Sequence, residues 1–155
     1  MSELKVNGVQ NFLGVVIPVI EGGGFGNGQK VILVKDIAKI HNTRVAKINE
    51  LINSNIDEFE LGIDILDMKN NKEFLDISKD SGIYTQNSIN ASSYIYLLSE
   101  QGYMILVGFM RTEKSKEIRK QLRREYFKMR TEIKQENSIE RARAWIRENT
   151  ELICE

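Results

Sequence analysis

The chain has 155 residues, with 22 basic and 22 acidic side chains, so its formal net charge is zero. This length suits one compact domain with an extension. The single cysteine, Cys154, excludes an internal disulfide and a cysteine-based metal cluster. No apolar run approaches the ~18 residues of a membrane span, and the N-terminus lacks a signal-peptide pattern, so we expect a cytoplasmic protein without a membrane partner.

Two runs of β-branched residues, 12–20 and 30–34, flank a glycine-rich stretch. They predict two antiparallel strands joined by a long hairpin near the N-terminus. Because Pro18 cannot donate a ladder hydrogen bond, we expect the first strand to lie at a sheet edge or to be bulged at this residue.

The glycine-rich stretch, "EGGGFGNGQK" at residues 21–30, resembles a phosphate-binding loop at first sight. A Walker A loop needs Lys and then Ser or Thr after its last glycine, whereas Gln29 follows Gly28 and Val31 follows Lys30. A dinucleotide fingerprint opens a helix, whereas this stretch leads into a strand. We therefore predict a hairpin tip. A nucleotide-dependent enzyme is a third hypothesis, which requires ATP or GTP binding.

Residues 35–55 have the pattern of a short helix, a tight turn and a second amphipathic helix over 43–53. Asn42 suits a left-handed helix stop, and Thr43 suits an N-cap. A DNA-reading helix-turn-helix has this anatomy, with its second helix in the major groove. The polar face of that helix offers side chains that can bond bases, namely Arg44, Lys47, Asn49 and Asn53. Two packed helices with a polar face are also common scaffolding, so both interpretations stay open.

The middle of the chain predicts further elements of one fold. We expect a strand within 60–70, a short helix or irregular cover over 71–82, and a strand at the end of 89–98. Ser99 can then cap a helix that begins at Glu100.

The helix that follows Ser99 is apolar nearly all round from Met104 to Phe109, which predicts a buried helix. Gly102 and Gly108 predict positions where another backbone packs closely.

The C-terminal part predicts a long helix over 112–135 and a second one that restarts at Ser138 as cap. Apolar residues form one stripe along the first helix: Ile118, Leu122, Tyr126, Met129 and Ile133. Such a stripe packs on the core or on a second copy of the chain. Trp145 on the terminal helix suggests an interface.

Charge is unevenly spread, because residues 111–134 carry ten basic and four acidic side chains, which is +6 locally. This excess indicates either an anionic partner or a solvated helix face.

Nothing in the sequence indicates catalysis. His41 is the single histidine, without the partners of a zinc set or a Ser-His-Asp arrangement. The carboxylates of residues 57–67 have the character of loop residues. We expect no catalytic residue, no metal and no cofactor, and hence no enzyme.

Three ordered segments, "VIEGG…GQKVILVKDIAKIHN", "VAKINELINSNIDEFELGIDILD" and "QNSINASSYIYLLSEQGYMILV", carry a family resemblance. Over roughly residues 10–130 the chain resembles the N-terminal domain of phage antirepressors of the ORF-six N-terminal type, related to KilA-N and Bro-N domains. The resemblance implies a DNA-binding module of a phage regulatory protein, in a bacterial host cell. Such proteins often carry a separate C-terminal domain that this sequence lacks, so we expect either part of a longer protein or a short regulator.

Together these patterns predict an α+β fold with a small antiparallel sheet, an N-terminal hairpin, an embedded helix-turn-helix and long C-terminal helices. Residues 1–110 would form the DNA-binding domain, and 111–155 an extension for packing or dimerisation. We expect a phage or prophage regulator that binds double-stranded DNA as a homodimer. The alternative is an interaction module that inactivates a phage repressor without binding DNA. The expected DNA-binding residues are Lys35, Lys39, Thr43, Arg44, Lys47, Asn49, Asn53, Arg119, Arg123 and Arg124.

Overall fold

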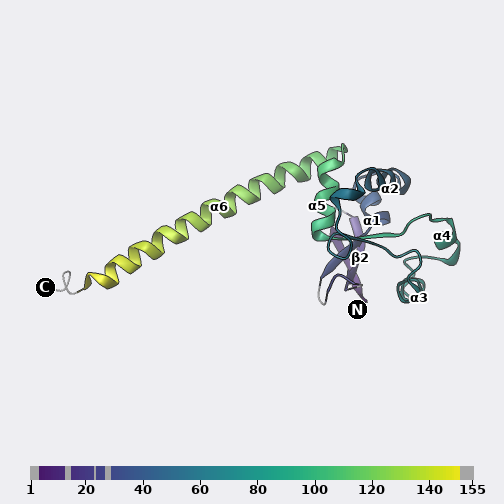
Figure 1. Cartoon of the computed structure of the whole chain (residues 1–155), viewed down its shortest axis with the longest axis horizontal. Coiled ribbons are helices and arrows are strands. Elements are labelled where there is room, and N and C mark those ends of the chain that lie inside the picture. The colour runs from purple at the N-terminus through teal and green to yellow at the C-terminus, as the bar shows by residue number, and fades with distance from the viewer. Residues whose placement is uncertain (1–3, 13–14, 23, 27–28, 151–155) are drawn as a thin grey trace. The chain divides into compact units, whose positions relative to one another are not determined.

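The computed structural model describes residues 4–12, 15–22, 24–26 and 29–150 (Figure 1). The chain divides into two compact units, Met1–Lys116 and Glu117–Glu155. The first unit holds the sheet and helices α1 to α5, and the second holds most of helix α6. The functional division at residue 110 stays a prediction.

An antiparallel five-stranded sheet forms the centre of the first unit, with strand order β1-β2-β3-β5-β4. Its strands are β1 Lys5–Phe12, β2 Val15–Glu21, β3 Lys30–Leu33, β4 Ile65–Asp67 and β5 Tyr96–Ser99. The sheet and its surrounding helices confirm the predicted α+β class. Strand β1 was not predicted, because its sequence shows no clear apolar alternation. In the structure its described side chains are exposed or half-buried. It forms by pairing with β2.

The predicted hairpin joins β2 to β3, which pair through Ile20 with Val31 and Glu21 with Lys30. The Gly22 amide donates to the Gln29 carbonyl at 3.0 Å and closes the loop. Phe25 packs against the apolar core below the loop. Within the described part of the loop, these contacts confirm a hairpin tip; Gly23, Asn27 and Gly28 lie outside the described residues.

Pro18 lies opposite Val9 of β1, where the register of the β1–β2 pair shifts between Val6 and Val9. Gly8 within this shift has a φ of 78°, which suits glycine. The bulge therefore lies in the partner strand. The expectation of an edge strand was wrong, because β2 has neighbours on both sides; Pro18 is accommodated since β3 pairs only with the far end of β2.

Five α-helices belong wholly to the first unit: α1 Val34–Ile40, α2 Val45–Ser54, α3 Lys72–Asp80, α4 Gln86–Ala91 and α5 Glu100–Phe109. A short 3-10 turn, η1 Ile56–Glu58, follows α2. Helix α3 confirms the helical alternative for 71–82, and the Asn71 side chain caps it by accepting from the Phe74 amide at 2.9 Å. Helix α4 was not predicted, although a reciprocal capping box between Thr85 and Ser88 marks its start.

Ser99 caps α5 as predicted, since its Oγ accepts from the Gly102 amide at 3.1 Å and donates to the Ile63 carbonyl at 2.6 Å. Gly102 also confirms the predicted close approach: a Cβ there would lie 2.0 Å from the Asp64 carbonyl oxygen. The same prediction was wrong for Gly108, which faces open space. Helix α5 is buried on one side only, because Met104 is 47% exposed.

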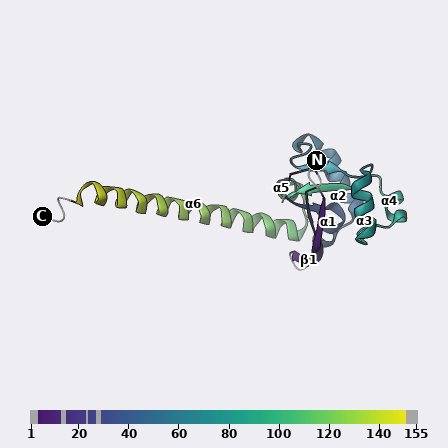
Figure 2. The ribbon, with the colours of Figure 1, turned by 90° about the horizontal axis from the view of Figure 1, so that it is seen from below.

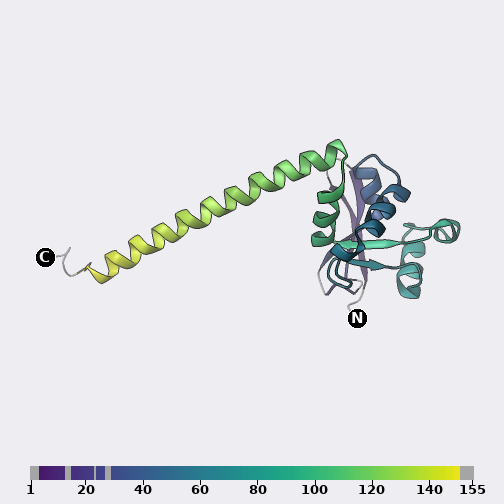
Figure 3. The same cartoon turned by 45° about the horizontal axis from the view of Figure 1, so that its top comes forward.

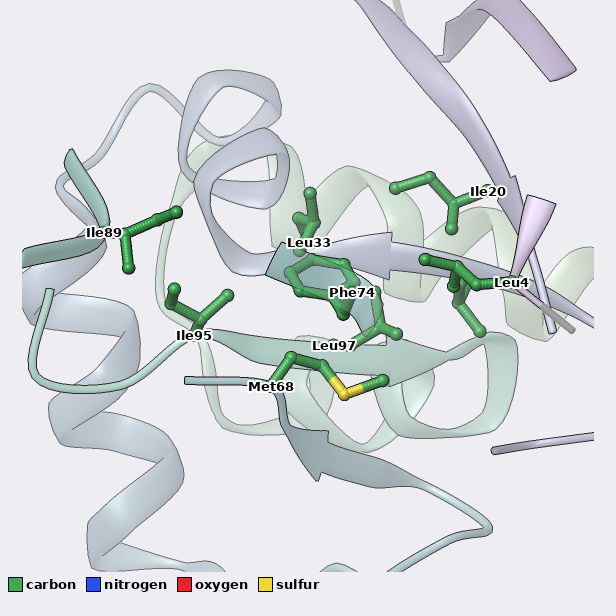
Figure 4. Packing of buried hydrophobic residues seen from close by; sticks show 9 residues of the cluster. Leu4, Ile20, Leu33, Met68, Phe74, Ile89, Ile95 and Leu97 are labelled. Carbon is green, nitrogen blue, oxygen red and sulfur yellow. The ribbon is translucent and has the colours of Figure 1, made fainter. Parts of the chain in front are cut away.

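The apolar core of the sheet gathers side chains from β2, β3, β5, α3 and α4 (Figure 4). Phe74 of α3 lies near Leu33 and Leu97, and Met68 and Ile95 are buried in the same cluster. Helices α3 and α4 lie together on the side of this unit away from α5 (Figure 2). Helix α2 contacts α1 and α5, and α1 and α5 each contact strands β3 and β5.

Helix α6, Glu113–Glu148, is continuous over 36 residues (Figure 3). The predicted break near Asn137 with a restart at Ser138 was wrong. Asn and Ser cost a helix interior only about half a kcal/mol each, and within the helix no Gly or Pro interrupts propagation. The Ser138 hydroxyl donates to the Lys134 carbonyl at 3.0 Å, so it is satisfied inside the helix rather than capping a new one.

Candidate nucleic-acid interface

Helices α1 and α2 are joined by the tight turn that the sequence predicted. Asn42 adopts a φ of 51°, in the left-handed region, and the Thr43 amide donates to the Ala38 carbonyl at 2.9 Å. This geometry confirms Asn42 as the stop of α1. Ile48 and Ile52 of α2 are fully buried, which fixes which face of α2 points outward.

The assignment of Thr43 as N-cap was wrong. Helix α2 begins at Val45, and Arg44 is its N-cap in an extended conformation without a side-chain capping bond. The Arg44 carbonyl accepts from the Lys47 and Ile48 amides at 3.1 and 3.3 Å. Helix α2 therefore starts one residue later than its sequence pattern suggested.

His41 at the end of α1 is buried, with 4% of its surface exposed. Its Nε2 lies 2.7 Å from the Tyr103 hydroxyl of α5, and its Nδ1 lies 3.0 Å from Oγ1 of Thr112. Burial lowers the pKa of His41 to about 4, with a smaller contribution from Lys114. His41 is thus a neutral, buried side chain that joins α1 to α5 and Thr112 within the first unit.

The outer face of α2 carries the four side chains expected to reach bases. Arg44, Lys47 and Asn53 are exposed, and Asn49 is half-buried. The Oδ1 atom of Asn49 is buried without a hydrogen-bond partner among the described residues. Asn53 instead accepts a hydrogen bond from the Tyr96 hydroxyl.

Two grooves run beside α2. One, of about 760 Å³, lies between α2 and residues 91–96, and Lys35, Asn49 and Asn53 line it. The other, of about 740 Å³, lies between α2 and residues 109–112, and Thr43 and Lys47 line it. The structure thus gathers five of the expected residues along the two sides of one helix.

A stacked aromatic pair in the wall of the first groove was missed by the sequence analysis. The rings of Tyr94 and Tyr96 are 5.2 Å apart between centroids and 8° from parallel. Tyr94 is 41% exposed. Burial raises the pKa of Tyr96 to about 12, so its hydroxyl keeps the proton that it donates to Asn53. The sequence signal for this pair is the spacing of two residues between Tyr94 and Tyr96 at the start of β5. In an extended chain this spacing places both rings on the same side.

The two lysines of α1 differ in their surroundings. The ammonium of Lys35 donates to the Ile83 carbonyl and lies 4.3 Å from the centre of the Tyr84 ring. Burial lowers the pKa of Lys35. Lys39 is exposed. Lys39 therefore offers its charge to solvent, whereas Lys35 is committed to contacts inside the domain.

The remaining expected residues, Arg119, Arg123 and Arg124, belong to α6 in the second unit. Arg123 and Arg124 are exposed, and Arg119 is half-buried.

Among the described residues, no group of three or more His, Cys, Asp or Glu side chains could hold a metal ion. Nor does the described part of the chain contain a helix with the length and apolar character that crossing a membrane requires.

The first unit is thus an α+β domain in which an antiparallel sheet supports two consecutive helices joined by a left-handed turn. The family model of the ORF6N domain matches residues 25–109, more than half of the chain. The protein belongs to the ORF6N domain family, which confirms the resemblance and is consistent with a phage-associated regulatory protein. No curated protein and no solved structure matches the chain. The matched region includes α2 and both groove walls up to Phe109.

Proposed function

We propose that the chain is a phage or prophage regulator that binds double-stranded DNA by placing α2 in the major groove. The observation that carries this proposal is the exposure of Arg44 at the N-cap of α2 and of Lys47 and Asn53 on its outer face, beside the groove that Asn49 lines. The proposed protein needs no cofactor, is not an enzyme and acts in the cytoplasm of the host cell.

The chemistry of this face suits base edges. Arg and Lys donate to guanine, and an Asn amide pairs with adenine through one donor and one acceptor. A buried acceptor without a partner costs about 1–3 kcal/mol, and turning the Asn49 amide into the groove that it lines would expose this acceptor to a base amino group. Glu50 on the same helix is exposed and can accept only from a donor such as the cytosine amino group.

Phosphate contacts would supply most of the affinity and orient the domain. Because the chain as a whole is neutral, that attraction must come from local charge. Lys39 on α1 and the basic residues of α6, including Arg119, Arg123 and Arg124, are the proposed sources. Lys35 and Thr43, which line the grooves, are proposed as neighbours of the DNA strands.

The test is a mobility-shift titration with duplexes selected from a random library by the full chain. We expect Arg44→Ala with Lys47→Ala to weaken binding about tenfold or more, and affinity to fall steeply between about 50 and 200 mM salt. The matched control is Lys72→Ala with Lys79→Ala, which removes the same charge from α3 and should change affinity little. A DNA affinity that does not change with salt concentration, or that is unchanged in the double variant Arg44→Ala with Lys47→Ala, refutes the proposal.

A second function, inactivation of a phage repressor by direct protein contact without DNA, is favoured by two exposed aromatic side chains. Tyr94 is 41% exposed and Trp145 is 59% exposed, and aromatic residues are enriched at protein interfaces. Retention of a phage repressor by the immobilised chain, together with no retention of any duplex, would favour this function over DNA binding.

A further inference from the structure

The described part of the second unit exposes large apolar side chains on α6. Tyr126, Met129 and Ile133 are 57%, 53% and 56% exposed, and Leu122 is half-buried. Ile118, the first residue of the predicted stripe, has only 8% of its surface exposed and is not part of the exposed stripe. A lone helix with such a stripe gains stability only when another surface covers it.

The spacing of the exposed stripe identifies the kind of surface. From Leu122 to Ile133 the steps are four, three and four residues, which is the spacing of d, a, d and a positions in a coiled coil. Leu122 and Met129 then occupy d positions, and Tyr126 and Ile133 occupy a positions.

The residues on one side of this apolar seam are basic, and those on the other side are acidic. In the same register Arg123 and Arg130 occupy e positions, and Glu125 and Glu132 occupy g positions. In a parallel pair, g of one helix faces e of the other, so that Glu125 lies opposite the second copy's Arg130. In an antiparallel pair, e faces e and g faces g, which sets Arg against Arg and Glu against Glu.

We propose that α6 pairs with α6 of a second copy of this chain as a short parallel coiled coil over residues 122–133. The same register ends the seam, because Glu136 and Glu140 occupy the next d and a positions. The seam is therefore about 18 Å long, which corresponds to a weak, concentration-dependent dimer. The pairing does not rest on DNA binding, but it brings two ORF6N domains to the same end of the coiled coil, as paired DNA half-sites require.

Sedimentation of the full chain over a range of concentrations tests the pairing. We expect Glu125→Arg alone and Arg130→Glu alone each to raise the dimer dissociation constant roughly tenfold, because each replaces two attractive contacts by two repulsive ones. The combined variant, E125R/R130E, should return it to within about threefold of the wild-type value. Lys128→Glu, at an outer c position, is the matched control and should have little effect. A wild-type chain that stays monomeric up to about 200 µM, or a combined variant no better than the single ones, overturns the proposal.

Cross-linking tests the orientation separately. With Cys154 replaced by Ser, we expect Ile133→Cys to form a disulfide between two copies, because equal positions face each other in a parallel pair. In an antiparallel pair Ile133 would lie opposite Leu122. A disulfide that forms only after mixing Ile133→Cys with Leu122→Cys chains therefore contradicts the parallel arrangement. Circular dichroism of each variant checks that α6 remains helical.

Discussion

The imidazole Nε2 of His41 lies 2.7 Å from the hydroxyl of Tyr103, and this contact ties the end of α1 to α5. Both side chains are buried, and the two rings are 5.8 Å apart between centroids. Oγ1 of Thr112 contacts the other imidazole nitrogen and itself accepts from the Ser115 amide at 3.1 Å. The position of the α1–α2 turn therefore depends on a neutral histidine.

We predict that His41 stays neutral well below its ordinary pKa of about 6.5. Its pKa in the folded chain is about 4, so only the unfolded chain takes up a proton between these values. The contribution of His41 to the free energy of unfolding is then constant above about pH 6.5 and falls by up to about 3 kcal/mol as the pH drops to about 4. Because His41 is the single histidine, its ring protons can be followed without ambiguity by NMR. Titration of this signal near pH 6.5 would contradict the prediction.

The variant His41→Asn is the control for this pH effect. We expect it to be less stable than the wild type at pH 7 but to lack the extra loss of stability between pH 6.5 and 4. Asp36, whose pKa is raised by burial, is present in both proteins, so its own contribution cancels in the comparison. Denaturant midpoints at several pH values give the measurement.

Gly102 and Gly108 lie in the same helix but differ in their surroundings, and we predict opposite effects of alanine. At Gly102 a Cβ would lie 2.0 Å from a backbone oxygen, which cannot move like a flexible side-chain end. We expect Gly102→Ala to cost about 3 kcal/mol or more. Gly108→Ala meets nothing within 4 Å and should stabilise by about 0.5–1 kcal/mol, through the helix propensity of alanine. Urea unfolding checks both; equal shifts in the same direction would show that the close approach is not real.

Asn42 is predicted to tolerate glycine better than alanine. Its φ of 51° is costly for a residue with a Cβ, by about 1–2 kcal/mol, and costs glycine little. We expect Asn42→Ala to lower the thermal midpoint and Asn42→Gly to leave it near the wild-type value. A loss of stability in both variants would mean that the Asn side chain, rather than its backbone conformation, matters at the turn.

Features with a local cause could be predicted from the sequence. The hairpin between β2 and β3, the stop at Asn42 and the cap at Ser99 each depend on residues close in the chain. Such signals survive because backbone conformation and capping hydrogen bonds are set within a few residues.

Features set by distant partners could not be predicted. Strand β1 is specified by its pairing with β2 and not by an apolar pattern of its own. The wall formed by Tyr94 and Tyr96 lies beside α2 only because β5 joins the sheet next to β3, about forty residues from α2 in the chain. The cap preferences of Asn137 and Ser138 predict a break in α6, but propagation of a long helix without Gly or Pro outweighs them.

The central claim is that the outer face of α2 reads DNA bases, and the specificity of Asn49→Ala tests it most directly. Affinities of wild type and variant are measured for the selected duplex and for a set with each base pair changed in turn. We predict that the wild type loses about 1–3 kcal/mol of binding free energy when one particular A·T pair is changed. The variant Asn49→Ala should no longer discriminate at this pair but should still discriminate at the other positions. Undiminished discrimination at every position in the variant would contradict the claim.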